Sequence, residues 1–318
     1  MMSQHSRREF LVGSTAAAGM LALRPEALLG AAPPSGKPAD MAIAKWSGAK
    51  DLANDQIDQA AGKMVQQAIE ALGGMNRFVK RGDVVWVKPN IGWDRAPETA
   101  ANTNPEMVRK IIQMCFDAGA KTVKVGDNPV HVAQKTYESS GIASVSRAAG
   151  ARVVFLDKSR FRDTALPEAE KVKEIPVYPE ILDADLVINV PVVKHHVLAT
   201  LTMCMKNYMG VIENRRFFHQ DLPTCIADIS QFMQPKARLH ILDGVRILTA
   251  HGPSGGKLED VRTTMTVAAG TDIVALDAWG AELIGRKPED IGSIVKGQER
   301  GLGKIDYRAL APREMAVS

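Results

Sequence analysis

The chain has 318 residues, 45% of them hydrophobic and 24% charged, which is the composition of a globular protein with a sizeable core. Its net charge of +4 is too small to indicate a nucleic acid or an acidic membrane surface as the partner. The three cysteines (Cys115, Cys204 and Cys225) are too few, and odd in number, for a disulfide framework.

The N-terminus has the features of a twin-arginine export signal. The run Ser6-Arg7-Arg8-Glu9-Phe10-Leu11-Val12 places an arginine pair ahead of Phe and Leu, and a weakly apolar stretch follows. Small residues at 30–32 suit processing. Residues 1–32 are therefore predicted to be a signal peptide that directs the protein through the twin-arginine machinery, to the periplasm or otherwise out of the cytoplasm. No later stretch has the roughly 18 apolar residues of a membrane span.

The rest of the chain alternates between helical and strand periodicity. Residues 33–55 are expected to form a linker or extended segment, residues 56–308 an α/β domain, and residues 309–318 a C-terminal tail. Helices are expected at 56–72, from Asn104-Pro105 onward, at 142–149, at 222–233 and at 273–284. Strands are expected at 84–87, 122–125, 153–156, 186–190, 239–242 and 265–269.

This alternation predicts an α/β fold, with a mostly parallel sheet flanked by helices and arranged in one lobe or two. Ligands of such sheets bind in a cleft beyond the C-terminal ends of the strands. The polar residues expected at these ends are Lys88, Asn90, Asp127, Asn128, Lys194, His196 and Asp243.

The segment Asn189–Gly210 is unusual because it carries cations and imidazoles in apolar surroundings. A lysine in such a place needs a partner or an anion to meet. Lys206 follows Lys194 by twelve residues, so a folded segment could bring both to one site. Asn207 and the pair His195-His196 belong to the same stretch.

The segment His251–Lys257 is rich in glycine. Gly252 and Gly255 allow the backbone to approach an anion or a cofactor closely. The segment lacks the Gly-Lys-Ser/Thr ending of a P-loop, and the chain has no Gly-x-Gly-x-x-Gly fingerprint. An ordinary surface loop is the alternative interpretation.

Several motifs, taken in order, resemble the domain of unknown function 362 family. They are V-K-P-N (87–90), N-P-E-M-V-R (104–109), A-G-A-K-T-V-K-V-G-D (118–127), D-A-D-L-V-I-N-V-P-V-V-K-H-H (183–196), M-K-N-Y-M-G-V-I (205–212), L-D-G-V (242–245), G-P-S-G-G (252–256) and G-T-D-I-V-A-L-D-A (270–278). Members of this family often carry iron–sulfur clusters in an added ferredoxin-like module. This chain has no Cys-x-x-Cys-x-x-Cys run, so the resemblance implies the fold and a site without that module.

The residues on these motifs predict one polar site. Lys194 and Lys206 are expected to clamp an anion, while His196 acts as acid, base or ligand and Asp243 orients it. The residues expected to bind the ligand or cofactor are Lys88, Asn90, Asn207, His219, Gly252 and Gly255. The alternative is a buried polar network that closes a domain interface.

Metal binding is a weaker possibility on this sequence. The candidate ligands are His131, His195, His196, His219, Cys204 and Cys225. Their spacing matches no known zinc pattern, and two adjacent histidines on a strand face opposite sides. The metal and the cofactor are therefore left unassigned. Asp277 is expected to lie early in a helix, where a negative charge is favourable.

The leading hypothesis is an exported α/β protein that binds an anionic small molecule or cofactor in a Lys/His-lined cleft, with catalysis left open. One alternative is a metal- or iron–sulfur-dependent redox protein, or a factor that matures one. The other alternative is a ligand-binding or scaffold module that turns nothing over.

Overall fold

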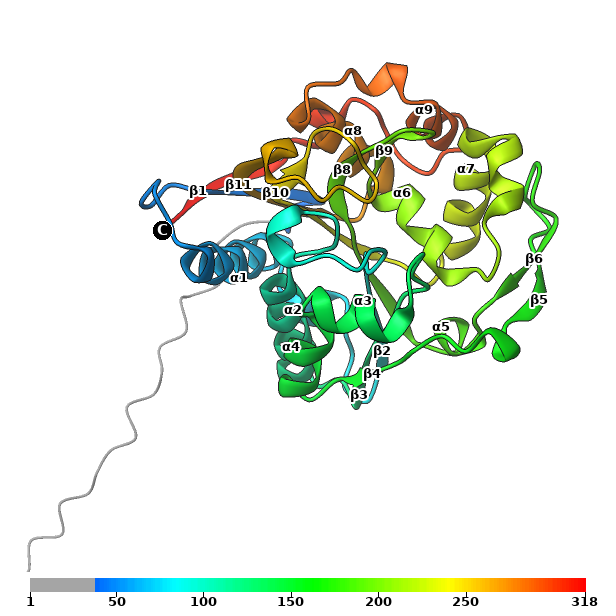
Figure 1. The fold of residues 1–318 in the computed structure, drawn as a ribbon, viewed down its shortest axis with the longest axis horizontal. Helices are drawn as coiled ribbons and strands as arrows, with labels where there is room; N and C mark the ends of the chain where they lie inside the picture. The colour runs from blue at the N-terminus through cyan, green and yellow to red at the C-terminus, as the bar shows by residue number, and fades with distance from the viewer. Residues whose placement is uncertain (1–37) are drawn as a thin grey trace, which may run out of the picture. The chain divides into compact units, whose positions relative to one another are not determined.

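The structure is a computed structural model that describes residues 38–318, and a ten-stranded mixed sheet lies at its centre (Figure 1). The predicted signal peptide, residues 1–32, lies outside the described residues. The strands of this sheet are β1 (Met41–Trp46), β2 (Val84–Pro89), β3 (Thr122–Val125), β4 (Arg152–Val153), β7 (Leu186–Val190), β8 (Val192–His196), β9 (Thr200–Thr202), β10 (Leu239–Leu248), β11 (Val261–Gly270) and β12 (Arg313–Val317). A separate antiparallel pair consists of β5 (Arg162–Ala165) and β6 (Glu174–Val177).

The strand order is β12-β1-β11-β10-β7-β2-β3-β4, with β8 paired to β10 and β9 paired to β8. The run from β10 through β7, β2 and β3 to β4 is parallel throughout. Antiparallel pairing is confined to β11 with its two neighbours and to the β8–β9 hairpin within this sheet. The predicted α/β fold with a mostly parallel sheet is confirmed.

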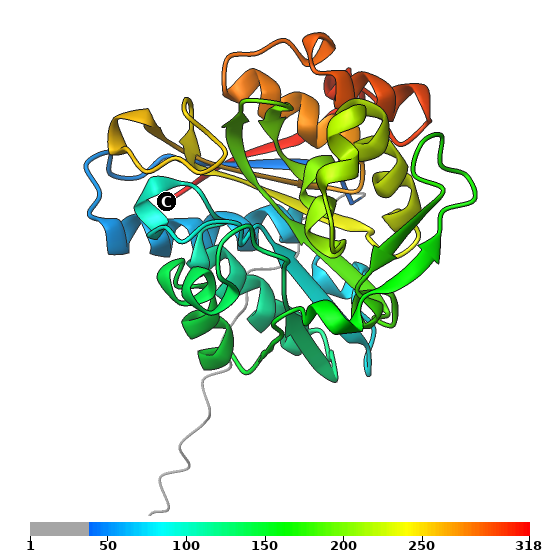
Figure 2. The ribbon, with the colours of Figure 1, turned by 45° about the vertical axis from the view of Figure 1, so that its right-hand side comes forward.

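Helices cover both faces of the sheet (Figures 1 and 2). They are α1 (Asn54–Ala71), α2 (Pro105–Asp117), α3 (Ala133–Ser139), α4 (Ile142–Ala148), α5 (Pro179–Leu182), α6 (Cys204–Asn207), α7 (Leu222–Met233), α8 (Ile273–Leu283) and α9 (Gly292–Glu299). Apolar side chains of α1, α2 and α4 pack on one face, and those of α6 to α9 pack on the other. Successive side chains of β2 enter the two cores in turn, Val85 and Val87 on one side and Trp86 on the other.

The expected start of the helix at Asn104-Pro105 is confirmed. Asn104 Oδ1 accepts the backbone N–H groups of Glu106 and Met107 at 2.9 and 3.3 Å, and Pro105 occupies the first helical position. This cap fixes the chain directly after the loop that follows β2, so it also sets the position of that loop at the sheet's C-terminal edge.

The segment 33–55, expected to be a linker or extended, and the tail expected over residues 309–318 each contain a strand of the sheet. Residues 41–46 form β1, which pairs with β11, and residues 313–317 form β12, which pairs with β1. The helix α1 begins at Asn54. Both ends of the described chain therefore belong to the sheet. No helix within residues 38–318 has the length and apolar character to cross a membrane.

Candidate functional site

A cleft of about 620 Å³ lies where strands β2, β3 and β8 end. Five side chains of ordinarily cationic type line it, together with two imidazoles: Lys158, Lys194, Lys206, Arg215, Arg216, His196 and His219. The lining carboxylates are Asp127 and Glu213. Its walls therefore carry an excess of positive character, at the edge of the sheet where a ligand is expected.

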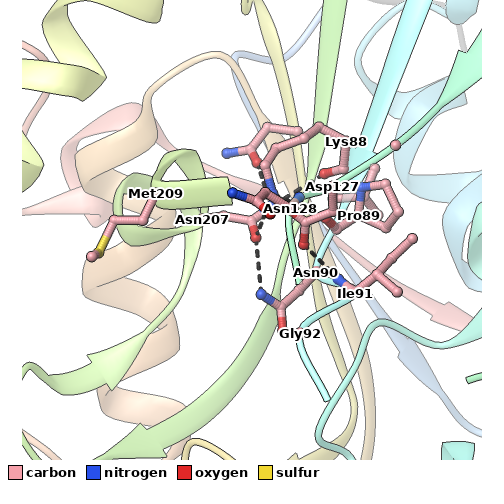
Figure 3. Close-up of polar contacts among 12 residues, drawn as sticks. Lys88, Pro89, Asn90, Ile91, Gly92, Asp127, Asn128, Asn207 and Met209 are labelled. Atoms are coloured by element: carbon pink, nitrogen blue, oxygen red, sulfur yellow. Dashed lines mark hydrogen bonds and ion pairs between the residues drawn. The ribbon is translucent and has the colours of Figure 1, made fainter. Parts of the chain in front are cut away.

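The floor of the cleft is a buried polar network centred on Lys88 and Asp127 (Figure 3). Lys88 Nζ donates to Asp127 Oδ1 at 2.8 Å, to Asn207 Oδ1 at 3.1 Å and to the carbonyl of Pro89 at 3.1 Å. Burial lowers the pKa of Lys88, and the Asp127 carboxylate opposes that shift. All three N–H bonds of this ammonium are used within the protein, so Lys88 supports the floor and leaves no donor for a ligand.

Asp127 is equally occupied. Its Oδ1 also accepts the backbone N–H of Asn128 at 2.9 Å, and its Oδ2 accepts that of Ile91 at 2.7 Å. A carboxylate that already accepts one ammonium and two backbone N–H groups offers little charge to the cleft. The negative side chain in the floor is thus neutralised from within.

Asn90 and Asn207 connect this floor to the wall. Asn207 Oδ1 accepts from Asn90 Nδ2 at 3.2 Å, and Asn207 Nδ2 donates to Asn189 Oδ1 at 2.8 Å. Asn90 Oδ1 in turn accepts from Lys194 Nζ at 2.8 Å (Figure 3 shows Asn90 and Asn207). The two asparagines are therefore expected to fix where Lys194 and Lys88 sit.

Lys194 lies on β8 and is 1% exposed. Besides Asn90, its ammonium donates to the carbonyl of Ala101 at 2.5 Å. Burial, followed by the nearby Lys206, holds the pKa of Lys194 well below its usual range. Lys194 borders the cleft, but its contacts and its low pKa make it a poorer anion clamp than the sequence suggested.

Lys206 is the contrasting case. It lies on α6 and lines the cleft, and no hydrogen bond or ion pair joins its side chain to any residue among 38–318. Burial, followed by the charge of Arg215, lowers the pKa of Lys206 to about 7. An unpartnered amine that titrates near neutral pH thus faces the cleft.

Asp277 positions the helix that carries Lys206. Its carboxylate accepts the backbone N–H of Cys204 at 2.6 Å and of Met205 at 3.1 Å, at the first turn of α6. Burial raises the pKa of Asp277 to about 7. Asp277 therefore acts at the start of a helix, as expected, but the helix is α6. The first turn of α8, the helix that contains Asp277, is capped by Asp272.

His196 presents one ring nitrogen to the cleft. Its Nδ1 accepts the backbone N–H groups of Leu198 and Ala199 at 3.1 and 3.2 Å, so the proton of the neutral ring resides on Nε2. Burial, followed by Lys206 and Lys194, lowers the pKa of His196 to about 3. His196 is therefore a neutral N–H donor at ordinary pH.

Arg215 belongs to the cleft although the sequence did not indicate it. Its Nε donates to the carbonyl of Met209 at 3.0 Å and its Nη2 to the carbonyl of Asn128, which leaves Nη1 without a partner among the described residues. The pKa of Arg215 is lowered by burial, with Asp127 opposing the shift. The polar residues 213–216 have the pattern of a solvent-exposed segment. Arg215 lines the cleft because the chain folds back there, so that its guanidinium contacts the carbonyl of Asn128.

Two expectations for the site are wrong. Asp243 does not orient His196: it lies within β10 and accepts the backbone N–H groups of Asn104 and Val245 at 2.8 and 2.9 Å. Burial raises the pKa of Asp243 to about 6. The reason is that β10 continues through Asp243, so this residue is not at a strand end.

The second concerns the glycine loop, because neither Gly252 nor Gly255 is among the residues that line the cleft. The N–H of Gly252 donates to His195 Nδ1 at 3.2 Å, and Gly255 packs against Leu248. Of the loop 251–257, Pro253 is the residue that lines the cleft. His219, in contrast, lines the cleft as expected for a ligand contact.

Within residues 38–318, no three His, Cys, Asp or Glu side chains are grouped in a way that could hold a metal ion. Of the candidate ligands, His196 and His219 line the cleft, Cys204 and Cys225 are buried, and His131 Nδ1 accepts the backbone N–H of Asp94.

Comparison with known proteins assigns the family. The family described as "Domain of unknown function (DUF362)" matches residues 85–282, which is more than half of the chain. The chain belongs to the DUF362 family. All of the polar network in the floor lies within that match, as do Lys194, His196, Lys206 and Arg215.

One relative and two solved structures are similar to this DUF362 chain. A thylakoid-associated protein of Synechocystis is 28% identical over 261 residues, which cover 78% of this chain and 79% of the relative. The lactate racemase apoprotein of Thermoanaerobacterium thermosaccharolyticum has a TM-score of 0.45 at 12% identity, over 76% of this chain and 56% of its own. A protein of Thermotoga maritima has a TM-score of 0.35 at 12% identity, over 78% and 59%. This chain thus spans little more than half of either solved chain.

Proposed function

We propose that the protein binds a small anionic molecule in the cleft formed by Lys194, His196, Lys206 and Arg215. The observation that carries this proposal is the imbalance of charge. Side chains of ordinarily cationic type, Arg215 among them, line one cavity, while the Asp127 carboxylate is paired with Lys88 and with backbone N–H groups. A concave site with few convergent polar groups and shifted pKa values has the usual character of a ligand site.

Unused donors support the same proposal. Lys206 Nζ and Arg215 Nη1 have no partner among residues 38–318, and the buried Oγ1 of Thr202, which also lines the cleft, has none. Buried polar groups are ordinarily hydrogen-bonded, so unpaired donors around a cavity favour an acceptor-rich ligand. A carboxylate or a phosphate supplies such acceptors.

A panel of small anions tests this proposal. Acetate, pyruvate and orthophosphate are added at constant ionic strength, with glycerol as the uncharged control, and the melting temperature is followed. At least one anion is expected to raise the melting temperature more than glycerol does, by mass action on the folded state. Lys206→Met should reduce this effect, and Lys257→Met, an exposed lysine outside the cleft, should not. Equal responses in all three proteins would contradict the proposal.

The proposal includes export by the twin-arginine route, because of the arginine pair at residues 7 and 8. Fractionation of cells that express the full chain tests it. The wild-type protein is expected outside the cytoplasm, and the double change Arg7→Lys, Arg8→Lys should retain it inside. Equal distributions of the two proteins would contradict the export proposal and leave the cleft proposal untouched.

The metal-dependent redox alternative has its own measurement. Elemental analysis and a visible spectrum of anaerobically purified protein would reveal a stoichiometric metal or an iron–sulfur chromophore. If the wild-type protein contains such a metal or chromophore and the double variant Lys194→Ala, His196→Ala lacks it, the redox function would replace the anion proposal.

A further inference from the structure

We propose that the anion is a 2-oxo acid and that Lys206 forms an imine with its carbonyl carbon. This inference rests on the proposed function, since it names the substrate class and the chemistry of the same cleft. It is based on three groups that line one cleft: an amine and a guanidinium N–H edge that have no partner among residues 38–318, and an imidazole that donates.

The amine is suited to attack a carbonyl because it is not tied to a carboxylate. Ordinary lysines are charged and hydrated or ion-paired, and the ammonium form has no lone pair. Lys206 has no hydrogen bond or ion pair within the described residues. Burial and the neighbouring Arg215 lower its pKa to about 7, so a large fraction is neutral amine at that pH. Desolvation beside a second cation is a known way to activate an amine.

The carboxylate of a 2-oxo acid has a place next to that amine. Arg215 is the charged group that acts on Lys206, and its Nε and Nη2 are held by the carbonyls of Met209 and Asn128. These two bonds fix the guanidinium plane and leave Nη1 for a ligand oxygen. A molecule whose carboxylate and carbonyl carbons are adjacent could meet Arg215 with one group and Lys206 with the other.

His196 supplies a donor for the carbonyl oxygen. Its Nδ1 is committed to the backbone, so the N–H on Nε2 is the free polar group of the ring, and the residue lines the same cleft. The other charged and titratable groups around Lys206 are Lys194, His219, Lys158, Arg216, Asp127 and Glu213. None of them forms an ion pair with Lys206.

The step balances without a further reagent. The lone pair of Lys206 Nζ forms a bond to the carbonyl carbon while the C=O π electrons move to oxygen, which takes up a proton. The carbinolamine then loses that oxygen as water, and both N–H protons of the amine are accounted for in the water formed. The product is a C=N bond between Lys206 and the oxo acid, with no change in oxidation state.

Reductive trapping tests the inference. The full-length protein is incubated with pyruvate and sodium cyanoborohydride, which reduces an imine to a stable secondary amine, and the modified lysine is located by peptide mass spectrometry. Modification is expected at Lys206, with a rate that rises as pH rises toward and through 7. Lys206→Met and Lys206→Arg should both lose it, and Lys257→Met should keep it. The arginine variant retains a cation should the methionine variant fail to fold.

Propanoate separates this inference from the proposed function, because it has the carboxylate without the carbonyl. If pyruvate and propanoate both raise the melting temperature and no adduct forms at Lys206, the anion site stands and the imine is overturned. Labelling spread over exposed lysines, and unchanged in Lys206→Met, also overturns it. If neither anion raises the melting temperature and no adduct forms, both the imine and the anion-binding proposal are overturned.

Discussion

Lys88 Nζ and Asp127 Oδ1 lie 2.8 Å apart beneath the cleft, and the two side chains are 0% and 2% exposed. The pair joins the end of β2 to the end of β3 and connects through Asn207 to α6, which carries Lys206. A buried ion pair of this kind holds geometry well, while the desolvation of its two charges offsets much of their attraction. The cleft therefore depends on a floor in which Lys88 and Asp127 bind each other and neighbouring groups of the protein.

Removing the carboxylate of this ion pair should destabilise the protein. Asp127→Ala leaves Lys88 without its counter-ion and the N–H groups of Ile91 and Asn128 without an acceptor. We expect the free energy of unfolding to fall by about 3–5 kcal/mol, measured by urea denaturation. Glu213→Gln is the matched control, because Glu213 is an exposed acid of the same cleft; its effect should stay within about 0.5 kcal/mol. Similar losses in both variants would contradict the role given to Asp127.

Gly210 has no room for a side chain. A Cβ there would lie 1.7 Å from Asp127 Oδ1 and 2.7 Å from Lys88 Nζ. Gly210→Ala should therefore displace the pair and lower the free energy of unfolding by about 1–3 kcal/mol, in line with overpacked sites. Gly62→Ala, on α1 with its nearest neighbour 3.9 Å away, should change stability little or raise it. An unchanged free energy of unfolding in Gly210→Ala would contradict the close contact of Gly210 with the ion pair.

The low pKa of Lys206 predicts a rise in stability on the alkaline side. The unfolded chain has the ordinary pKa of 10.5 and the folded protein about 7, so the unfolded state binds more protons between these values. The free energy of unfolding should therefore increase with pH across that window. Lys206→Met should flatten the slope, whereas Lys257→Met should preserve it. Lys88 and Lys194, whose pKa values are also lowered, account for the slope that remains.

Asp277 predicts the opposite slope at lower pH. Its pKa is raised from 3.8 to about 7, so the folded protein binds more protons than the unfolded chain between these values. This contribution to stability is complete below 3.8 and is lost as pH rises through 7. Asp277→Asn should reduce that loss, and it should keep an acceptor for the first turn of α6.

Removal of the Asp277 acceptor tests its positioning role. Asp277→Ala leaves the N–H groups of Cys204 and Met205 unpaired, at a cost of about 1–3 kcal/mol. Because α6 carries Lys206, stabilisation by the anion that proves best in the panel should weaken as well, and Asp277→Asn should restore it. Loss of stability with unchanged anion binding would confine Asp277 to a structural role.

The fold was predictable to a large extent because most elements have strong local signals. The helix expected at 222–233 is α7, and the strand expected at 186–190 is β7. The strands β1 and β12 were missed for a physical reason. The residues of β12 have mixed polarity, and both strands form by pairing with segments far away in the sequence.

The site was predictable only in part. Lys194, His196, Lys206 and His219 do line one cleft, because the ends of parallel strands meet at one edge. Sequence could not show that Lys88 would be enclosed, that Asp243 would lie inside a ten-residue strand, or that Arg215 would fold back onto Asn128. These outcomes depend on long-range contacts, which have no local pattern.

The most direct test of the central claim is the pH dependence of stabilisation by acetate, pyruvate and orthophosphate, in the wild-type protein beside Lys206→Met. An anion near Lys206 favours its charged form and raises its pKa, so binding should take up a proton above pH 7. The increase in melting temperature is expected to be largest below pH 7, to decline above pH 7, and to be smaller in Lys206→Met. A melting temperature that no anion raises more than glycerol at any pH, or that rises equally in the variant, would contradict it.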